Sequence, residues 1–447
     1  MKHREKRILL ASVAVICLAR IASVFFSQGI IYDELSYMGI ARSLNEGAGY
    51  GYVSDPGRDG WRPPLWPFLL SLWLLVSGSA IESGRLLSAF LGIGGVAAIY
   101  FLGKKIYGEK VGLYSSLFLA VNPSHWFFST KALVEPLLLF LEILFVLALW
   151  LSLRDSRYLI PAVMLLPLLF MVKYTSVLFW LFFCLFLLVK KRDWLADKNL
   201  WIGAVLGLLI MSPWIFLNTG RFGSALGPAS WSLEQVGFSK SVDLFYLFTL
   251  HLQLAALLPF SLIGLYMIWK KRTESSRLFL FLAALLILVF IVGMSAIEVK
   301  RERYIMPVIP PMTIAAAYFF GNFRHPGVKS WHVPVLAALI IAGGVAAFLY
   351  GSFSYPSAER FISMEKAGHF LSENCSGKKV YGEYPYVFWF TRQRAYQLSE
   401  LGRDEKNICV LFDGYVYSSQ EEKRNDMERL KDFDAVFQSN DVRVFSG

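Results

Sequence analysis

The sequence is poor in charged residues, and this scarcity sets the class of protein. Of its 447 residues only 17% are Asp, Glu, Lys or Arg, whereas soluble domains carry about 25%. Hydrophobic residues make up 56%, and they gather in runs of the ~20 residues that cross a bilayer. These observations exclude a disordered chain and an ordinary soluble enzyme, and they predict a polytopic membrane protein.

Residues that bind metals and nucleotides are also scarce. The four cysteines have no metal-like spacing, and His125, His251 and His369 lie in separate segments, so the sequence predicts no metal site. A Gly-rich, Lys-containing nucleotide-binding loop is missing, which disfavours a nucleotide-sugar donor. The stretch Gly92 to Gly95 lies inside a hydrophobic run, where close helix packing is the better explanation.

Eleven hydrophobic runs are candidates for transmembrane helices. The first follows a basic N-terminus and lacks the small-residue cleavage site of a secretory signal, so we expect it to be retained. The runs lie near residues 8–26, 86–103, 111–128, 133–152, 158–172, 175–189, 199–217, 244–269, 278–296, 304–320 and 333–350.

Basic clusters determine the expected orientation of these runs. The run from Leu65 to Val76 has about a dozen residues, too few to cross, and we interpret it as a juxtamembrane helix. The N-terminus and all the basic clusters then lie in the cytoplasm, and the first loop, residues 27–85, lies outside. The net charge of +11 therefore reflects topology, and we expect no nucleic-acid partner. The clusters are Lys104-Lys105, Arg154/Arg157, Lys190-Lys191-Arg192, Lys270-Lys271-Arg272 and Arg324/Lys329.

The tail is expected to form a separate domain. We divide the chain into a membrane domain, residues 1–353, and a soluble extracytoplasmic domain, residues 354–447. Alternating patterns in the tail predict a small α/β fold. Cys375 and Cys409 could pair there, and the sequence leaves this open. The expected elements are helices over 358–373 and 420–430 and strands over 379–381, 408–412, 435–437 and 442–445.

Ionisable residues gather near the outer ends of the hydrophobic runs, where charge is costly. A carboxylate at the water–lipid boundary can accept a proton from a hydroxyl group, and Arg or Lys there can hold a lipid phosphate. This combination suggests transfer from a phosphate-linked lipid. The residues concerned are Arg20, Asp33, Glu34, Arg42, Arg58, Arg62, Arg85, Lys131, Glu135, Lys173, Lys300, Arg301, Glu302 and Arg303.

Several of these residues have a structural explanation as well. Asp33 and Glu34 could cap the helix that follows them, because acidic residues favour a helix N-terminus. Arg20 could extend its side chain to the outer interface. Lys173 and Arg303 could be interface anchors at the ends of spans.

Four short motifs become informative through their order and spacing. Together they resemble the GT-C membrane glycosyltransferases, and most of all the group of protein O-mannosyltransferases and lipid A aminoarabinose transferases. The resemblance covers residues 8–350. The motifs are Arg20-(x12)-Asp33-Glu34 with Tyr37 and Ala41, Arg62-Pro63-Pro64-Leu65-Trp66-Pro67, Arg85-Leu86-Leu87-Ser88 with Gly92, and Glu302-Arg303-Tyr304 leading into Pro307 and Pro310.

The resemblance implies an all-α GT-C membrane domain with juxtamembrane helices in the first outer loop. It also implies a polyprenyl-phosphate sugar donor and an inverting transfer on the non-cytoplasmic face. By position, Asp33 is the catalytic base and Glu34 its neighbour in the site. Residues expected to bind the lipid phosphate are Arg20, Arg85, Lys173, Arg303 and Tyr304, and residues expected to organise the site or the acceptor are Arg62, where many relatives have His, and Glu135.

The main hypothesis is therefore a glycosyltransferase that moves a sugar from dolichyl or undecaprenyl phosphate to a hydroxyl of a protein, lipid or glycan. It would act at the outer face of a plasma or inner membrane. Arg and Lys can meet the charge of the leaving phosphate, so no obligatory metal or other cofactor is expected. The alternative is a transporter or flippase for an anionic lipid-linked substrate, although no repeated half is evident. A third hypothesis, a non-catalytic lipid-binding scaffold, predicts that Asp33 is replaceable.

Overall fold

The computed structural model describes residues 3–51, 60–237, 245–323, 342–344, 358–402, 405–415 and 420–447. They belong to two compact units. The membrane unit comprises Met1–Phe25, Trp61–Trp66 and Arg85–Leu349, and the C-terminal unit comprises Phe26–Gly60, Pro67–Gly84 and Tyr350–Gly447. Much of the expected first outer loop thus belongs to the same unit as the tail. The boundary expected at 353/354 lies outside the described residues and stays a prediction.

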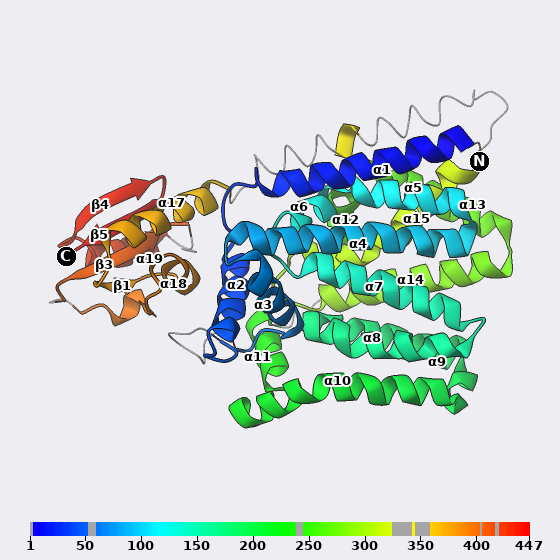
Figure 1. Cartoon of the computed structure of the whole chain (residues 1–447), viewed down its shortest axis with the longest axis horizontal. Helices are drawn as coiled ribbons and strands as arrows, with labels where there is room; N and C mark the ends of the chain where they lie inside the picture. The colour runs from blue at the N-terminus through cyan, green and yellow to red at the C-terminus, as the bar shows by residue number, and fades with distance from the viewer. Residues whose placement is uncertain are drawn as a thin grey trace. The chain divides into compact units, whose positions relative to one another are not determined.

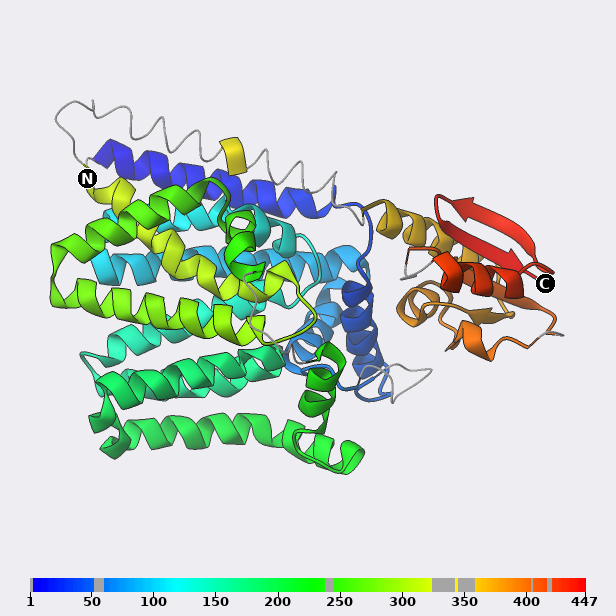
Figure 2. The same cartoon turned by 180° about the vertical axis from the view of Figure 1, so that it is seen from behind.

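The membrane unit is a bundle of helices that run alongside one another (Figures 1 and 2). Among the described residues, six helical segments are long and apolar enough to cross a membrane. They are α1 (His3–Val24), α4 (Ile81–Tyr107), α7 (Glu135–Ser152), α10 (Lys198–Phe222), α14 (Glu274–Ser295), and the 3-10 helix η5 (Glu302–Val308) with α15 (Ile309–Asn322).

Shorter helices complete the unit. They are α5 (Glu109–Ala120), α6 (Pro123–Ser129), α8 (Leu159–Val172), α9 (Val177–Lys190), α11 (Gly227–Val236), α12 (Phe245–Leu254) and α13 (Leu258–Lys271), with 3-10 turns at Ser156–Tyr158, Tyr174–Ser176, Arg192–Ala196 and Ala255–Leu257. The count of eleven spans stays a prediction. Most of the run expected over 333–350 lies outside the described residues.

Two of the expected spans are each built from two helices. Residues 111–128 divide into α5 and α6 because the Asn122 side chain accepts a hydrogen bond from the His125 N–H (2.9 Å), as an N-cap does. Pro123 follows, and proline suits the first turn of a helix but not its interior. Residues 244–269 divide into α12 and α13 at the turn Ala255–Leu257.

Four of the five predicted basic clusters lie at helix ends or helix junctions at one end of the bundle, and the fifth, Arg324/Lys329, lies outside the described residues. The junctions after α4, α7, α9 and α13 lie at the same end of the membrane unit as the start of the chain (Figure 1). At that end, two ion pairs connect α1 to α5: Lys6 to Glu109 (2.6 Å) and Glu5 to Lys110 (3.4 Å). The four described clusters therefore gather at one end of the bundle, and the side of the membrane on which that end lies stays a prediction.

Glycines allow close approach between helices of the membrane unit. A Cβ on Gly264 of α13 would collide with the carbonyl oxygen of Ala315 in α15, and a Cβ on Gly92 of α4 would collide with the Ser129 side chain. Small residues of this kind let backbones approach in lipid, where packing drives helix association. The close-packing explanation for the Gly92 segment is thereby confirmed.

The C-terminal unit contains a five-stranded sheet of order β2-β1-β3-β5-β4. Strand β1 is parallel to β2 and β3, whereas β5 is antiparallel to β3 and β4. The predicted α/β fold is confirmed, with one short helix and one short strand more than expected. The elements are α17 (Ala358–Asn374), β1 (Lys379–Tyr381), α18 (Tyr384–Thr391), β2 (Ala395–Tyr396), a 3-10 turn (Leu398–Glu400), β3 (Ile408–Asp413), α19 (Gln420–Arg429), β4 (Asp434–Ser439) and β5 (Val442–Ser446).

A buried cluster and one covalent link stabilise this sheet. Tyr381, Val410 and Phe445 belong to its core and are at most 5% exposed. A disulfide joins Cys375, just after α17, to Cys409 in β3. The pairing that the sequence left open is therefore present.

The expected first outer loop supplies two helices. Helix α2 (Tyr32–Asn45) begins directly before the Asp33-Glu34 pair, and α3 (Leu65–Ser77) forms where the juxtamembrane helix was expected. With thirteen residues, α3 rises about 20 Å and is shorter than the ~30 Å hydrocarbon core.

We predict that Gly264→Ala destabilises the bundle. The added methyl group would meet the Ala315 carbonyl, and overpacking of this kind costs about 1–3 kcal/mol. The melting temperature of the purified protein in detergent measures it. Gly220→Ala in α10 is the control, because its methyl group would meet nothing within 4 Å. Equal melting temperatures for the two variants would contradict the packing assigned to Gly264.

Candidate active site

The two neighbouring carboxylates at the start of α2 have different surroundings. Glu34 is fully buried, and its Oε2 accepts a hydrogen bond from the Ile31 N–H at 2.9 Å. This contact satisfies one of the N–H groups that a helix start leaves unpaired. Asp33 is only half-buried. The capping explanation therefore holds for Glu34, and Asp33 is the more accessible carboxylate of the pair.

A second group of predicted residues meets at one end of the membrane unit. Glu135, the first residue of α7, is 1% exposed, and its Oε1 lies 3.1 Å from Lys173 Nζ and 3.6 Å from Arg303 Nε. Lys173 follows α8 and Arg303 lies in η5. Lys173 Nζ also lies 4.8 Å from the centre of the Tyr304 ring. The structure therefore brings together four residues from three parts of the chain that are distant in the sequence.

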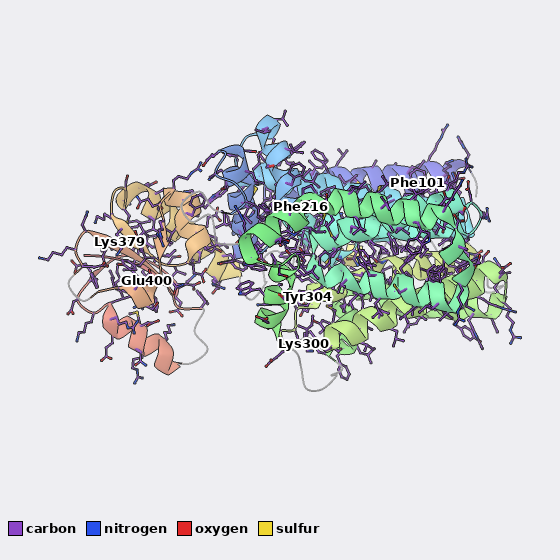
Figure 3. The ribbon with its side chains drawn as sticks, turned by 90° about the horizontal axis from the view of Figure 1, so that it is seen from below. Phe101, Phe216, Lys300, Tyr304, Lys379 and Glu400 are labelled. Carbon is purple, nitrogen blue, oxygen red and sulfur yellow. A yellow bond between two sulfur atoms is a disulfide. The ribbon has the colours of Figure 1, made fainter. Side chains whose placement is uncertain are left out.

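This group has the charge and access that an anion site needs. Two cations, Lys173 and Arg303, face the Glu135 carboxylate. The side chains of Lys173 and Arg303 retain 15% and 26% of their exposure. Glu135 Oε2 has no hydrogen-bond partner among the described residues. Figure 3 shows Tyr304 toward one end of the membrane helices and Phe101 toward the other.

The neighbouring basic residue Lys300 has a different environment. Its Nζ donates to the carbonyl oxygens of Ser295 (2.6 Å) and Ile297, just after α14. Lys300 therefore stabilises a helix end, where cations are favoured. In the basic segment before α15, Lys300 therefore binds the end of α14, whereas Arg303 binds Glu135.

Arg20 is fully buried in α1. Its guanidinium lies 3.0 Å from His125 Nδ1, donates to the Ala120 carbonyl at 2.6 Å, and donates to Ser129 Oγ at 3.3 Å. The expectation that Arg20 extends to the interface is wrong, because these groups bind its two Nη atoms inside the protein. Its predicted role in phosphate binding stays a prediction, and the geometry favours a link between α1 and the α5–α6 corner.

Arg62 and Arg85 are also buried in the membrane unit, at 6% and 3% exposure. The Arg62 guanidinium lies 5.0 Å from the centre of the Trp61 ring. The Trp61 carbonyl accepts a hydrogen bond from the Tyr174 hydroxyl at 2.8 Å, so the Arg62 segment adjoins the residue after Lys173. Arg85 lies in the first turns of α4, and its predicted role stays a prediction.

The structure also identifies residues that the sequence did not single out. His125 contacts Arg20, and Tyr386 of α18 donates to the Ile30 carbonyl at 2.5 Å, directly before α2. Neither residue belongs to a motif, and only the tertiary fold brings them to these partners. In the described ranges, no three His, Cys, Asp or Glu side chains are placed to hold a metal ion.

Comparisons with known proteins agree with this architecture. The model of the family "Dolichyl-phosphate-mannose-protein mannosyltransferase" matches residues 61–216. No curated protein matches the sequence. The structure is similar to that of ArnT from Cupriavidus metallidurans in the apo state, with TM-score 0.73 and 14% identity over 99% of this chain and 98% of that chain.

Two further structures show the same similarity. ArnT from Cupriavidus metallidurans bound to undecaprenyl phosphate gives TM-score 0.71 and 14% identity over 98% of this chain and 97% of that chain. The archaeal oligosaccharyltransferase AglB from Archaeoglobus fulgidus, in complex with an inhibitory peptide and a dolichol-phosphate, gives TM-score 0.54 and 12% identity over 91% of this chain and 66% of that chain.

The resemblance to the GT-C group is thereby confirmed at the level of fold. The chain has an ArnT-like GT-C fold over nearly its whole length. Together with the six apolar helices, this fold makes it an integral membrane protein.

We predict that Arg20→Met lowers the stability of the protein by about 2–4 kcal/mol, because His125 and the Ala120 carbonyl would lose a buried charged partner. A thermal unfolding curve in detergent measures the loss. Arg157→Met is the matched control, since the Arg157 side chain is 82% exposed and a surface ion pair contributes little. Unchanged stability of Arg20→Met would remove the structural role and return Arg20 to the phosphate-binding candidates.

Proposed function

We propose that the protein is an inverting glycosyltransferase. It would move a sugar from a polyprenyl phosphate, dolichyl or undecaprenyl, to an acceptor hydroxyl on a protein, lipid or glycan. The observation that carries the proposal is the ArnT-like fold along 99% of the chain. Relatives in this fold bind undecaprenyl phosphate or a dolichol-phosphate, which supports a lipid-linked donor.

Asp33 is proposed as the catalytic base. Its carboxylate would accept the proton of the acceptor hydroxyl while the acceptor oxygen forms a bond to the anomeric carbon of the sugar. The bond from that carbon to the phosphate oxygen breaks in the same step, so the configuration inverts. The half-buried position of Asp33 supports this role, and the buried contact of Glu34 with Ile31 supports a role for Glu34 in forming the helix start.

Lys173 and Arg303 are proposed to bind the phosphate of the donor. The leaving group is a lipid monophosphate, and cations held in place before the reaction stabilise the charge that it gains. Glu135 lies 3.1 and 3.6 Å from the two side chains, and its negative charge offsets part of their positive charge. Because these cations supply the electrostatic stabilisation, we propose that no divalent metal is required.

We further propose that the N-terminus is cytoplasmic and that Asp33 and the C-terminal unit lie outside. The gathering of basic clusters at the end of the bundle that holds the chain's start (Figure 1) supports a cytoplasmic assignment for that end. The Cys375–Cys409 disulfide supports an oxidising compartment for the C-terminal unit.

Asp33→Asn is expected to lower the turnover number by about 10²- to 10⁴-fold, the usual contribution of a general base. The assay is sugar transfer by the purified protein in lipid, with a panel of polyprenyl-phosphate sugars and acceptors. Asp193→Asn, an exposed carboxylate in the turn before α10, is the control and should keep wild-type turnover.

Two outcomes of this assay would contradict the proposal. Equal turnover in Asp33→Asn and wild type would remove Asp33 as the base. No turnover with any donor, in a protein that still binds polyprenyl phosphate, would favour a transporter or a scaffold. Repeating the assay with EDTA tests the metal, since loss of activity restored by Mg²⁺ or Mn²⁺ would contradict metal independence.

Two substitutions in the phosphate group should act in opposite directions. Lys173→Met should weaken binding of the polyprenyl phosphate about tenfold or more, because a hydrogen bond to a charged group contributes about 1.5–3 kcal/mol. Glu135→Gln removes the opposing negative charge and should tighten binding. The dissociation constant for polyprenyl phosphate in detergent measures both, and the exposed Lys198→Met is the control. Weaker binding by both variants would contradict the assignment, since general misfolding alone would produce it.

A further inference from the structure

Helix α18 of the C-terminal unit packs along α2, the helix that carries Asp33. Tyr386 and Trp389 are three residues apart in α18, so they share one face of the helix, and Arg392 follows directly after the helix ends. Tyr386 is 1% exposed and contacts the segment before α2. Trp389 and Arg392 contact residues at the other end of α2. One face of a single short helix therefore reaches both ends of α2.

The contact before α2 is made to one peptide group. Tyr386 Oη donates to the Ile30 carbonyl at 2.5 Å, and the N–H of the same peptide bond, that of Ile31, donates to Glu34 Oε2 at 2.9 Å. A peptide group is planar and rigid, so two partners on opposite sides determine its orientation. Burial raises the pKa of the Tyr386 phenol well above its usual value, so the hydroxyl keeps the proton that it donates.

The contact at the other end of α2 is aromatic and charged. The Arg42 guanidinium lies 3.9 Å from the centre of the Trp389 ring, well inside the range of a cation–π interaction, and its Nη2 donates to the Ser79 carbonyl at 3.0 Å. Burial and the neighbouring Arg392 lower the pKa of Arg42 to about 10, so it stays charged at neutral pH. Arg392 itself pairs with Glu46 at 3.3 Å.

A partly buried ion cluster fixes α18 within its own domain. Arg360 of α17 lies 2.8 Å from Glu383 Oε1 and 2.6 Å from Asp413 Oδ2. Glu383 immediately precedes α18, and Asp413 is the last residue of β3. The cluster therefore lies where the parallel strands β1 and β3 end, the edge at which open α/β sheets commonly bind ligands.

In this protein the same edge faces the start of α2. Gly29 has φ of +67°, and a Cβ there would lie 3.0 Å from the Cβ of Phe361 in α17. The segment before α2 thus runs against α17 as well as α18. The chain's own first loop contacts this edge, where related architectures place a ligand.

We infer that α18 is a positioning element for the catalytic helix, with Tyr386 and Trp389 as positioning residues that set the location of Asp33. The inference rests on the proposed function for the part that concerns Asp33. It assigns the C-terminal domain a role in the chemical step rather than in acceptor binding. The variants should therefore lower kcat and leave the KM of donor and acceptor unchanged.

The test compares Tyr386→Phe with Tyr381→Phe in the full-length protein. Both variants remove one phenolic hydroxyl from the same domain, but the Tyr381 hydroxyl donates to Glu405 and not to the segment before α2. The rate of amide hydrogen exchange in the peptide covering residues 29–38, measured by mass spectrometry, shows how firmly the start of α2 is held. This measurement needs no assay of activity. Trp389→Leu and Trp389→Tyr form a second pair, because tyrosine retains a ring for Arg42.

The positioning role predicts faster exchange at residues 29–38 in Tyr386→Phe and a kcat lower by about tenfold, since small displacements of a reacting group are costly. Tyr381→Phe should match wild type in both, and Trp389→Tyr should recover much of what Trp389→Leu loses. Unchanged exchange in Tyr386→Phe, or a raised acceptor KM with unchanged kcat, would overturn the inference. If the wild type transfers no sugar, the proposed function fails, and the exchange data alone still decide whether α18 holds α2.

Discussion

The cost of burying charge governs the membrane unit. Removing an ion from water costs several kcal/mol unless a partner of opposite charge meets it. Glu135 is 1% exposed, so it is tolerated only because the end of α8 brings Lys173 and η5 brings Arg303. The contacts of Arg20 are different, because neutral groups of α5 and α6 bind its guanidinium instead of an opposite charge. One of these groups is Ser129, and its position requires that Gly92 has no side chain. Binding of the buried charge and close helix packing therefore depend on each other at Arg20.

The start of α2 shows how two adjacent carboxylates acquire different tasks. Successive residues of a helix point about 100° apart, so Asp33 and Glu34 cannot face the same surroundings. Glu34 turns inward to the Ile31 N–H, and Asp33 stays half-buried. The buried member stabilises the helix start, and under the proposed function its more exposed neighbour accepts the proton. The resemblance in sequence implies different roles for the two residues, and the geometry supplies a physical reason for the difference.

Local signals in the sequence predicted much of the fold. Hydropathy located α1, α4, α7 and α14 because their length and composition are local properties, and short hydrophobic runs located β3 and β5 for the same reason. The meeting of Glu135 with Lys173 and Arg303 could be anticipated only through resemblance.

Other features depend on partners that no local pattern contains. Helix α18 has eight residues and begins with Tyr-Pro, and its identity as a helix depends on packing. The His125–Arg20 contact and the Tyr386–Ile30 hydrogen bond join segments that are more than a hundred residues apart. Local periodicity in the sequence therefore cannot predict them. The Cys375–Cys409 pair stayed open because sequence separation does not determine the Cα distance on which a disulfide depends.

In the C-terminal unit, paired charges also hold a helix, α18, in place. Arg360 meets Glu383 and Asp413, and this cluster sets the direction in which α18 leaves the sheet. From α18, the Tyr386 hydroxyl fixes the carbonyl of the Ile30–Ile31 peptide, while Glu34 fixes its N–H. Hydrogen bonds that share a peptide group polarise one another, so neither contact is independent of the other. A displacement of the sheet would therefore shift the start of α2, because the two hydrogen bonds of the planar Ile30–Ile31 peptide connect α18 to Glu34. For this reason the small domain is best understood as part of the framework that holds Asp33.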